Sequence, residues 1–468
     1  MDGIVQYVGK WEIPGCSEPV GGTLSVSSEG RFIELILQCR YDSAPGKRGL
    51  LPRGGVDFLH GKLFSGNEVS LFHCESVDYS CQVGSHITEW VSAEFAFWGL
   101  GEPDPIFRGA LVDFGEIVEW SGLCSYKWDH DLDSFVGTLV WERGDTLAFE
   151  LPEGMKLEIY PLQGGFTPTL FCNEVKAEQR IIFSIEYDCP TSWEKIVEAI
   201  RWIRSFIELG MSTGVVVKGI KYLHDNKRLS PSDVRDENRG ELVPADVSIG
   251  VGDSKRIDRT SMSRYYSFTL EEAATCGVLA LWFEKRDVLE PVVGLYTTAY
   301  SVRNESASTF FLCLAQALET FHARFFDSDV KLFIKRIDGI INENSTSDNC
   351  PSWLIDSGQR AANRIFLKSR LNELLYADGI MPVEMPGLDI PTFSEKITAT
   401  RNYYTHYDDR NLKKAFSVDE LLQVNGKLLL LLEYHLMRVL GFEREFAAER
   451  VSRKNWKMFC EDTSIRFI

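Results

Sequence analysis

The stretch RNYYTHYDDR, residues 401–410, holds the residue types best suited to chemistry on a phosphodiester. Arg401 and His406 stand five positions apart in it. An arginine is always charged and binds phosphate oxygens, and a histidine can exchange a proton near neutral pH. Together they could neutralise charge that develops on a phosphate and remove a proton from a nucleophile. The alternative is that both side chains only make structural hydrogen bonds near a helix end.

Helical geometry does not place this pair on one face. Five positions turn a helix by about 140°, whereas Asn402 and His406, four apart, share a face. A common site for Arg401 and His406 therefore needs a helix end, a bend or a second copy of the chain. The last option predicts a homodimer or a higher homo-oligomer.

Two other sets of charged residues could serve this pair. Glu319, in an otherwise apolar helical pattern, could orient Arg401 or His406 through a charge-assisted hydrogen bond, or it could pair with Arg324 or Lys335.

A basic stripe is the second set. Arg360, Arg364 and Lys368 recur every four residues, so they should line one helix face. They are candidates for RNA-phosphate contacts, and a solvated face is the alternative.

The first part of the chain has the pattern of a β domain. Apolar and β-branched runs alternate with Gly and Pro, and one helix is expected over 192–209. Repeated strands without long helices favour a sandwich or a barrel. Strands are expected at 22–28, 31–39, 68–74, 89–99, 146–151, 156–162, 180–187 and 215–222.

The second part has the pattern of a helical bundle. Capping-box patterns begin at Thr269, Thr392 and Ser417, each followed three residues later by Glu. Helices are expected over 270–286, through 310–325, around 333–340, over 354–376, across the motif and up to Leu440. Residues 224–262 have weak periodicity and are expected to be an excursion and linker. The fold prediction is an α+β multidomain chain, with a β-rich module at 1–262 and an all-α bundle at 263–468.

Composition limits the functions that the chain can have. The net charge of −18 argues against a protein that coats nucleic acid, so any RNA site must be local. The 11 cysteines include no CxxC pair, and His73, Cys74, Cys81 and His86 match no standard zinc spacing, so no metal is expected. No phosphate-binding GxxxxGK[ST], HExxH or GxSxG motif is present. Without a secretion signal or a membrane-length apolar run, a cytoplasmic location is expected.

The motif at 401–406 resembles the R-polar-x-x-x-H signature of HEPN domains, helical bundles of which many are metal-independent endoribonucleases. The whole chain resembles the ApeA group of bacterial anti-phage proteins. The resemblance rests on VGKWEIPG near the start, HGKLFSGNEVSLFHC at 60–74, ALETFHARFF at 317–326 and RNYYTHYD at 401–408.

This resemblance implies a ribonuclease that needs no cofactor and acts in phage defence by cleaving host RNA, with tRNA as one candidate. His406 would be the base and Arg401 would stabilise the phosphate, leaving 2′,3′-cyclic phosphate and 5′-hydroxyl ends. Asn402 and Tyr407 are candidates for orienting the base or the phosphate. The β-rich module would sense infection, through a phage-derived protein trigger, or restrain the nuclease.

Two other functions remain open. One is a non-enzymatic sensor or scaffold whose bundle mediates dimerisation. The other is a glycan-binding module, based on Trp11, Trp90, Trp98, Trp120, Trp128 and Trp141, although core packing is the ordinary use of such residues.

Overall fold

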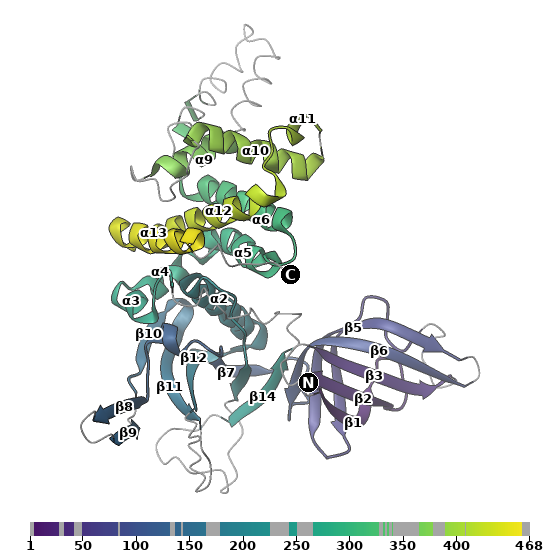
Figure 1. Cartoon of the computed structure of the whole chain (residues 1–468). Coiled ribbons are helices and arrows are strands. Elements are labelled where there is room, and N and C mark those ends of the chain that lie inside the picture. Colours follow the sequence, from purple (N-terminus) through teal and green to yellow (C-terminus); the bar gives the residue numbers. More distant parts are fainter. Residues whose placement is uncertain are drawn as a thin grey trace. The chain divides into compact units, whose positions relative to one another are not determined.

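The described part of the chain forms two compact units (Figure 1). A computed structural model describes residues 4–27, 32–41, 49–82, 85–131, 136–141, 144–164, 178–224, 243–249, 265–326, parts of 331–339, 365–377, 389–407 and 409–460. The β-rich unit consists of Met1–Ile207 and Val215–Ile257, and the helical unit of Glu208–Gly214 and Asp258–Ile468. The predicted fold class, a β-rich module followed by a helical bundle, is confirmed.

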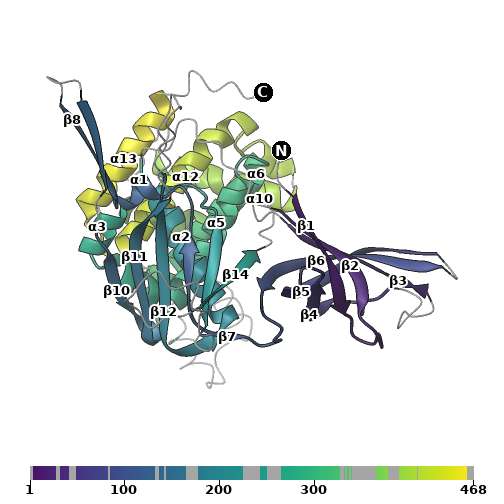
Figure 2. The same cartoon turned by 90° about the horizontal axis from the view of Figure 1, so that it is seen from below.

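Six antiparallel strands at the start of the β-rich unit close into a barrel. They are β1 (Ile4–Glu12), β2 (Val20–Ser27), β3 (Ile33–Arg40), β4 (Val56–Leu63), β5 (Glu68–Cys81) and β6 (His86–Trp98). Their order is β6-β3-β2-β1-β4-β5, and β5 pairs back onto β6. Figure 2 shows these strands as one group. Closure removes the unpaired edges that an open sheet would expose.

Trp11 fills the barrel interior. Its side chain is fully buried, and its backbone partner across the β1–β4 pair is Gly61. A Cβ at Gly61 would overlap the Trp11 ring, so this strand position accepts only glycine beside the indole. Trp120 is also fully buried, which supports the packing role rather than a glycan surface for these two tryptophans. The side chains of Trp128 and Trp141 lie outside the described residues.

The sheet continues from β6 into the second half of the β-rich unit. Its order there is β6-β14-β13-β7-β12-β11-β10. These strands are β7 (Ile106–Asp113), β10 (Leu147–Leu151), β11 (Met155–Gly164), β12 (Glu178–Ser192), β13 (Gly219–His224) and β14 (Val243–Ile249). The linker expected at 224–262 is therefore partly wrong, because β14 pairs with both β13 and β6. The short sequence VPADVSI forms a strand because it pairs with strands that are distant in the sequence.

Smaller elements complete this unit. A separate hairpin joins β8 (Tyr126–Asp131) and β9 (Val136–Trp141), and a single helical turn forms α1 (Val118–Ser121). The expected helix is present as α2 (Trp193–Met211), whose last turn belongs to the helical unit. Trp193 begins this helix among the rings of Phe72, Phe95 and Phe97.

The helical unit contains the elements of the motif. Its described helices are α3 (Leu270–Thr275), α4 (Val278–Glu284), α5 (Arg286–Val302), α6 (Ala307–Phe325), α9 (Leu367–Tyr376), α10 (Ile390–His406), α11 (Asp409–Leu412), α12 (Val418–Val439) and α13 (Arg444–Cys460). The helix expected over 270–286 is instead broken at Gly277, which has φ +64°. Helices α5 and α13 were not expected. Residues 354–364 of another expected helix lie outside the described part.

Two of the three capping boxes predicted for the helical part of the chain are present. Thr269 and Ser417 each accept a hydrogen bond from the backbone N–H of the Glu three residues later, and that Glu returns one. The box expected at Thr392 is wrong. Asp389 caps α10 instead, accepting from the Thr392 N–H at 2.9 Å. The reason is the order Asp-Ile-Pro, since proline is favoured in the first helical turn and aspartate at the cap.

Helix α12 forms the core of the helical unit. Its residues 428–437 are buried on every side, which is the pattern of a helix surrounded by others. It packs on α6 and α13, and α5 packs on α6. The apolar run at 428–432 thus belongs to a protein core. Among the helices of the described chain, none has both the length and the apolar character of a membrane span.

A buried ion pair fixes α13 to this core. The Lys454 ammonium donates to the Glu433 carboxylate at 2.7 Å, to Ser267 at 2.7 Å and to Ser212. The other Glu433 oxygen accepts from the hydroxyls of Tyr296 and Tyr300 at 3.0 and 2.9 Å. Burial lowers the pKa of Lys454, although the Glu433 charge opposes this shift. All three ammonium hydrogens have acceptors, as a buried charge requires.

Candidate functional site

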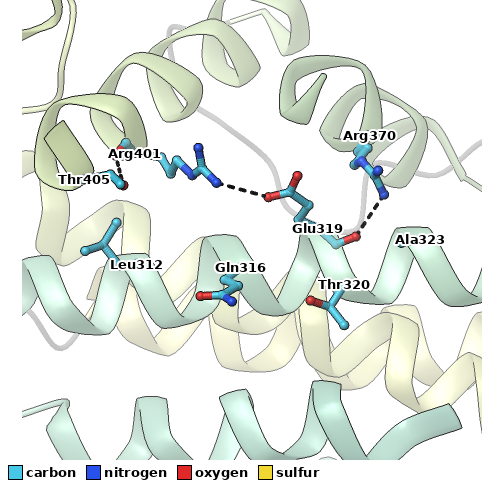
Figure 3. Close-up of a pocket in the computed structure, with 8 residues that line it drawn as sticks. All are labelled: Leu312, Gln316, Glu319, Thr320, Ala323, Arg370, Arg401 and Thr405. Carbon is cyan, nitrogen blue, oxygen red and sulfur yellow. Dashed lines mark hydrogen bonds and ion pairs between the residues drawn. The ribbon is translucent and has the colours of Figure 1, made fainter. Parts of the chain in front are cut away.

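An open pocket of about 540 Å³ lies over one face of α6, between α9 and α10 (Figure 3). Its lining comprises Leu312, Gln316, Glu319, Thr320 and Ala323 from α6, Arg370 from α9, and Arg401 and Thr405 from α10. The α6 members recur at helical spacing, so they form one stripe. The opposite stripe, with Phe310, Leu314 and Phe321, is buried in the bundle. Helix α6 therefore forms the floor of the pocket.

Arg401 reaches this pocket from α10. Its guanidinium lies 3.7 Å from the Glu319 carboxylate, and Nη1 donates to the Asn402 side-chain oxygen at 3.4 Å. The side chains of Arg401 and Glu319 are 40% and 32% exposed, so solvent screens their attraction. The Thr405 hydroxyl donates to the Arg401 carbonyl oxygen at 2.7 Å. Arg401 is thus oriented but accessible to a ligand.

His406 is the last residue of α10. The following Tyr407 adopts left-handed backbone angles, φ 50° and ψ 39°, and its N–H donates to the Tyr403 carbonyl. The imidazole is exposed, does not line the pocket, and makes no hydrogen bond or ion pair with another described residue. Arg401 and His406 are therefore not joined by direct contact in one chain, although the helix does end at His406.

Three tyrosines gather at this helix end. The Tyr403 ring lies 5.1 Å from that of Tyr404 and 5.7 Å from that of Tyr407. Tyr407 is 71% exposed, so its ring is offered to solvent. Burial raises the pKa of Tyr404, which keeps that phenol neutral at physiological pH. Exposed aromatic rings of this kind can stack on unpaired bases.

Arg370 brings a second guanidinium to the pocket. Its Nε donates to the Ile365 carbonyl at 3.1 Å, and Nη1 donates to the Glu319 carbonyl at 3.3 Å. On the same helix Glu373 binds the buried His322 of α6, with Nε2 and Oε2 2.5 Å apart. Burial lowers the pKa of His322, and the Glu373 charge opposes that shift.

Lys368 is the one member of the expected basic stripe within the described residues. Lys368 forms an ion pair with Glu395 at 3.0 Å and does not line the pocket, while Arg360 and Arg364 lie outside the described residues. Of the alternative partners for Glu319, Arg324 instead donates to the Asp287 carbonyl. The structure thus brings Glu319, Asn402 and Arg401 together.

Sequence reasoning missed four polar residues of the pocket: Gln316, Thr320, Arg370 and Thr405. The first two could have been found, because they share a stripe with Glu319 in an otherwise apolar helix. Arg370 carried no such signal. Within the described residues, no group of three His, Cys, Asp or Glu side chains could hold a metal ion.

Comparison with known protein families covers both units. The family model described as ApeA N-terminal domain 1 matches residues 6–260, more than half of the chain. The model described as Apea-like HEPN matches residues 312–446, a range that contains every residue of the pocket lining. No curated protein and no solved structure gives a significant match.

Proposed function

This chain belongs to the ApeA family of anti-phage proteins with a C-terminal HEPN domain, and we propose that it is an endoribonuclease that cleaves host RNA without a metal ion. The HEPN domain indicates nuclease activity in general terms. The observation that carries the proposal is Arg401, the first residue of the motif, in an open pocket rather than in the core. RNA, with tRNA as a candidate, is the proposed substrate.

The residues of the motif supply a complete reaction. His406 takes the proton of a ribose 2′-hydroxyl, whose oxygen attacks the adjacent phosphorus. The bond from phosphorus to the 5′ oxygen breaks, and that oxygen takes a proton from water and leaves as a 5′-hydroxyl. Arg401 neutralises the charge that grows on the phosphate oxygens. The other product is a 2′,3′-cyclic phosphate, and DNA should resist cleavage because it lacks the nucleophile.

The site is proposed to form in a dimer. Arg401 and His406 make no direct contact within one chain, so a second copy could bring its own His406 to the pocket. Four exposed apolar side chains in the segment that follows the helix end would be covered by such contact: Tyr407, Leu412, Val418 and Leu422. Asn402 and Tyr407 would then orient the phosphate or a base.

The test compares wild type with Arg401→Ala and His406→Ala on total RNA in the presence of a chelator. Loss of the arginine should lower kcat by about 10²–10³-fold, and loss of the base by about 10²–10⁴-fold. Mixing the two inactive variants should restore part of the activity if each site takes residues from two chains. Circular dichroism and light scattering would verify equal folding and assembly. Cleavage that survives both substitutions would contradict the proposal.

The β-rich unit is proposed to restrain the nuclease until a phage-derived protein is sensed. A large separate module has no evident part in the cleavage reaction itself. A non-enzymatic dimerisation scaffold is the alternative, and it is favoured if neither wild-type protein nor protein from infected cells cuts RNA.

A further inference from the structure

We infer that Arg370 is a second phosphate-binding residue of the pocket, which holds a backbone phosphate of single-stranded RNA next to the one that Arg401 contacts. The inference rests on the proposed function and names a substrate contact for the same site. It assigns a role to a residue outside the motif.

The positive charge of Arg370 is not neutralised by the described residues around it. Within the described part of the chain, both of its hydrogen bonds go to neutral backbone carbonyls, those of Ile365 and Glu319. These bonds orient the guanidinium without neutralising it, and they use two of its five N–H donors. Among the described residues, no carboxylate lies within ion-pair distance of Arg370. Arg401 differs, since the Glu319 carboxylate is 3.7 Å away.

The carboxylate expected to pair with Arg370 has another partner. Glu373 lies three residues later on α9, a spacing at which opposite charges normally pair. Its Oε2 is instead 2.5 Å from Nε2 of His322, a fully buried residue. His322 therefore binds the carboxylate that would otherwise pair with Arg370, and the Arg370 guanidinium stays available for a ligand.

The pocket has room and polarity for a strand of RNA. Its α6 floor runs from Leu312 to Ala323, which is about 16 Å at 1.5 Å per residue. Gln316 and Thr320 supply neutral hydrogen-bonding groups along it, and the two arginines outnumber the one carboxylate. In a chain with a net charge of −18, this is a local positive site. Figure 3 shows Arg370 and Arg401 on either side of Glu319.

Binding and its salt dependence test this contact directly. The probe is a short, labelled, single-stranded 2′-O-methyl RNA of mixed sequence, which cannot be cleaved because the 2′ nucleophile is blocked. Arg370→Gln should weaken binding about tenfold and reduce the slope of log K against log salt by about 0.7, the value of one single-strand phosphate contact. Arg370→Lys keeps the charge and should retain most of the slope.

Two control variants distinguish a phosphate contact of Arg370 from a purely structural role of that residue. Arg324→Gln removes an exposed α6 arginine that also donates to one backbone carbonyl, and it should leave both quantities unchanged. Gln316→Glu leaves the Arg370 hydrogen bonds intact and adds a carboxylate to the pocket, so it should also weaken binding. If Arg370→Gln does not fold, unchanged binding by this second variant would overturn the inference.

The outcomes are distinguishable from those of the proposed function. If wild type cleaves RNA but Arg370→Gln binds the probe with unchanged affinity and slope, the inference alone fails. The inference alone also fails if Arg370→Gln and Arg370→Lys lose affinity equally while the slope of log K against log salt is unchanged. If wild type binds the probe with the Arg370-dependent slope yet never cleaves RNA, the phosphate contact stands and the nuclease proposal falls. A wild type that cleaves RNA but does not bind the probe overturns the inference and leaves the proposed function in place.

Discussion

At the scale of residues, two side chains of the pocket have different proposed roles. Arg401 would act on RNA, and Glu319 would hold Arg401 in place. Arg401 can contact a phosphate directly, whereas Glu319 can act only through Arg401, because a carboxylate repels phosphate. Their contact of 3.7 Å is a screened ion pair rather than a short hydrogen bond. The two residues should therefore differ sharply in their importance for the reaction.

Glu319→Gln tests this difference. Exposed ion pairs contribute at most about 1 kcal/mol, so kcat should fall by no more than about fivefold. KM for RNA should fall as well, because the substitution removes a negative charge from the pocket. Steady-state cleavage rates over a range of RNA concentrations would measure both constants. A loss of kcat as large as that of Arg401→Ala would show instead that Glu319 takes part in the reaction.

At the scale of elements, the buried Lys454–Glu433 pair should govern the stability of the helical unit. Lys454→Met removes one charge and leaves the Glu433 carboxylate buried beside neutral donors, the hydroxyls of Tyr296, Tyr300 and Ser267. Breaking such a pair costs about 3–5 kcal/mol in the free energy of unfolding. Calorimetry of the full chain should show a lower transition temperature for the helical unit and an unchanged transition for the β-rich unit.

Arg453→Met provides the matched control for that change. Arg453 is the preceding residue of α13, and among the described residues its ion-pair partner is the exposed Glu449 one turn earlier. Its replacement should alter stability by less than about 1 kcal/mol. Equal effects of the two substitutions would mean that the buried pair contributes no special stability.

Local signals in the sequence predicted which helices and strands form better than they predicted where a helix begins or which strands pair. The Ser417–Glu420 box was predictable because both halves of the cap lie within four residues. The start of α10 was not, since Asp389 with the proline after it competes with Thr392 for the cap. Strand β14 was also missed, because its apolar residues become a strand only beside β6 and β13.

The same limit applies to the pocket. The sequence identified the motif and offered Arg401 among several partners for Glu319. It could not identify Arg370, because the freedom of that arginine depends on Glu373 being bound by His322, 51 residues earlier in the chain. In a site assembled from three helices, residues distant in the sequence compete for the same charged side chain, as His322 and Arg370 do for Glu373.

At the scale of the whole molecule, the question is whether the β-rich unit restrains the helical one. Testing this requires damage to the barrel that leaves the helical unit chemically unchanged. Gly61 offers such a position, because it faces Trp11 across the β1–β4 pair and a larger side chain would displace the buried indole. Gly219 in β13 is the matched control, since a Cβ there would meet nothing within 4 Å.

Gly61→Val in the full chain should therefore release the nuclease in uninfected cells, while Gly219→Val should not. Overpacking costs about 1–3 kcal/mol or more, which is a large part of the stability of one domain. The measurements are growth of cells that express each variant and the appearance of RNA with 2′,3′-cyclic phosphate ends. Adding Arg401→Ala should abolish both effects if they arise at the pocket. If Gly61→Val disrupts the barrel, keeps the calorimetric transition of the helical unit and still leaves growth and RNA intact, the β-rich unit does not restrain cleavage, and its role must be sought in sensing or assembly.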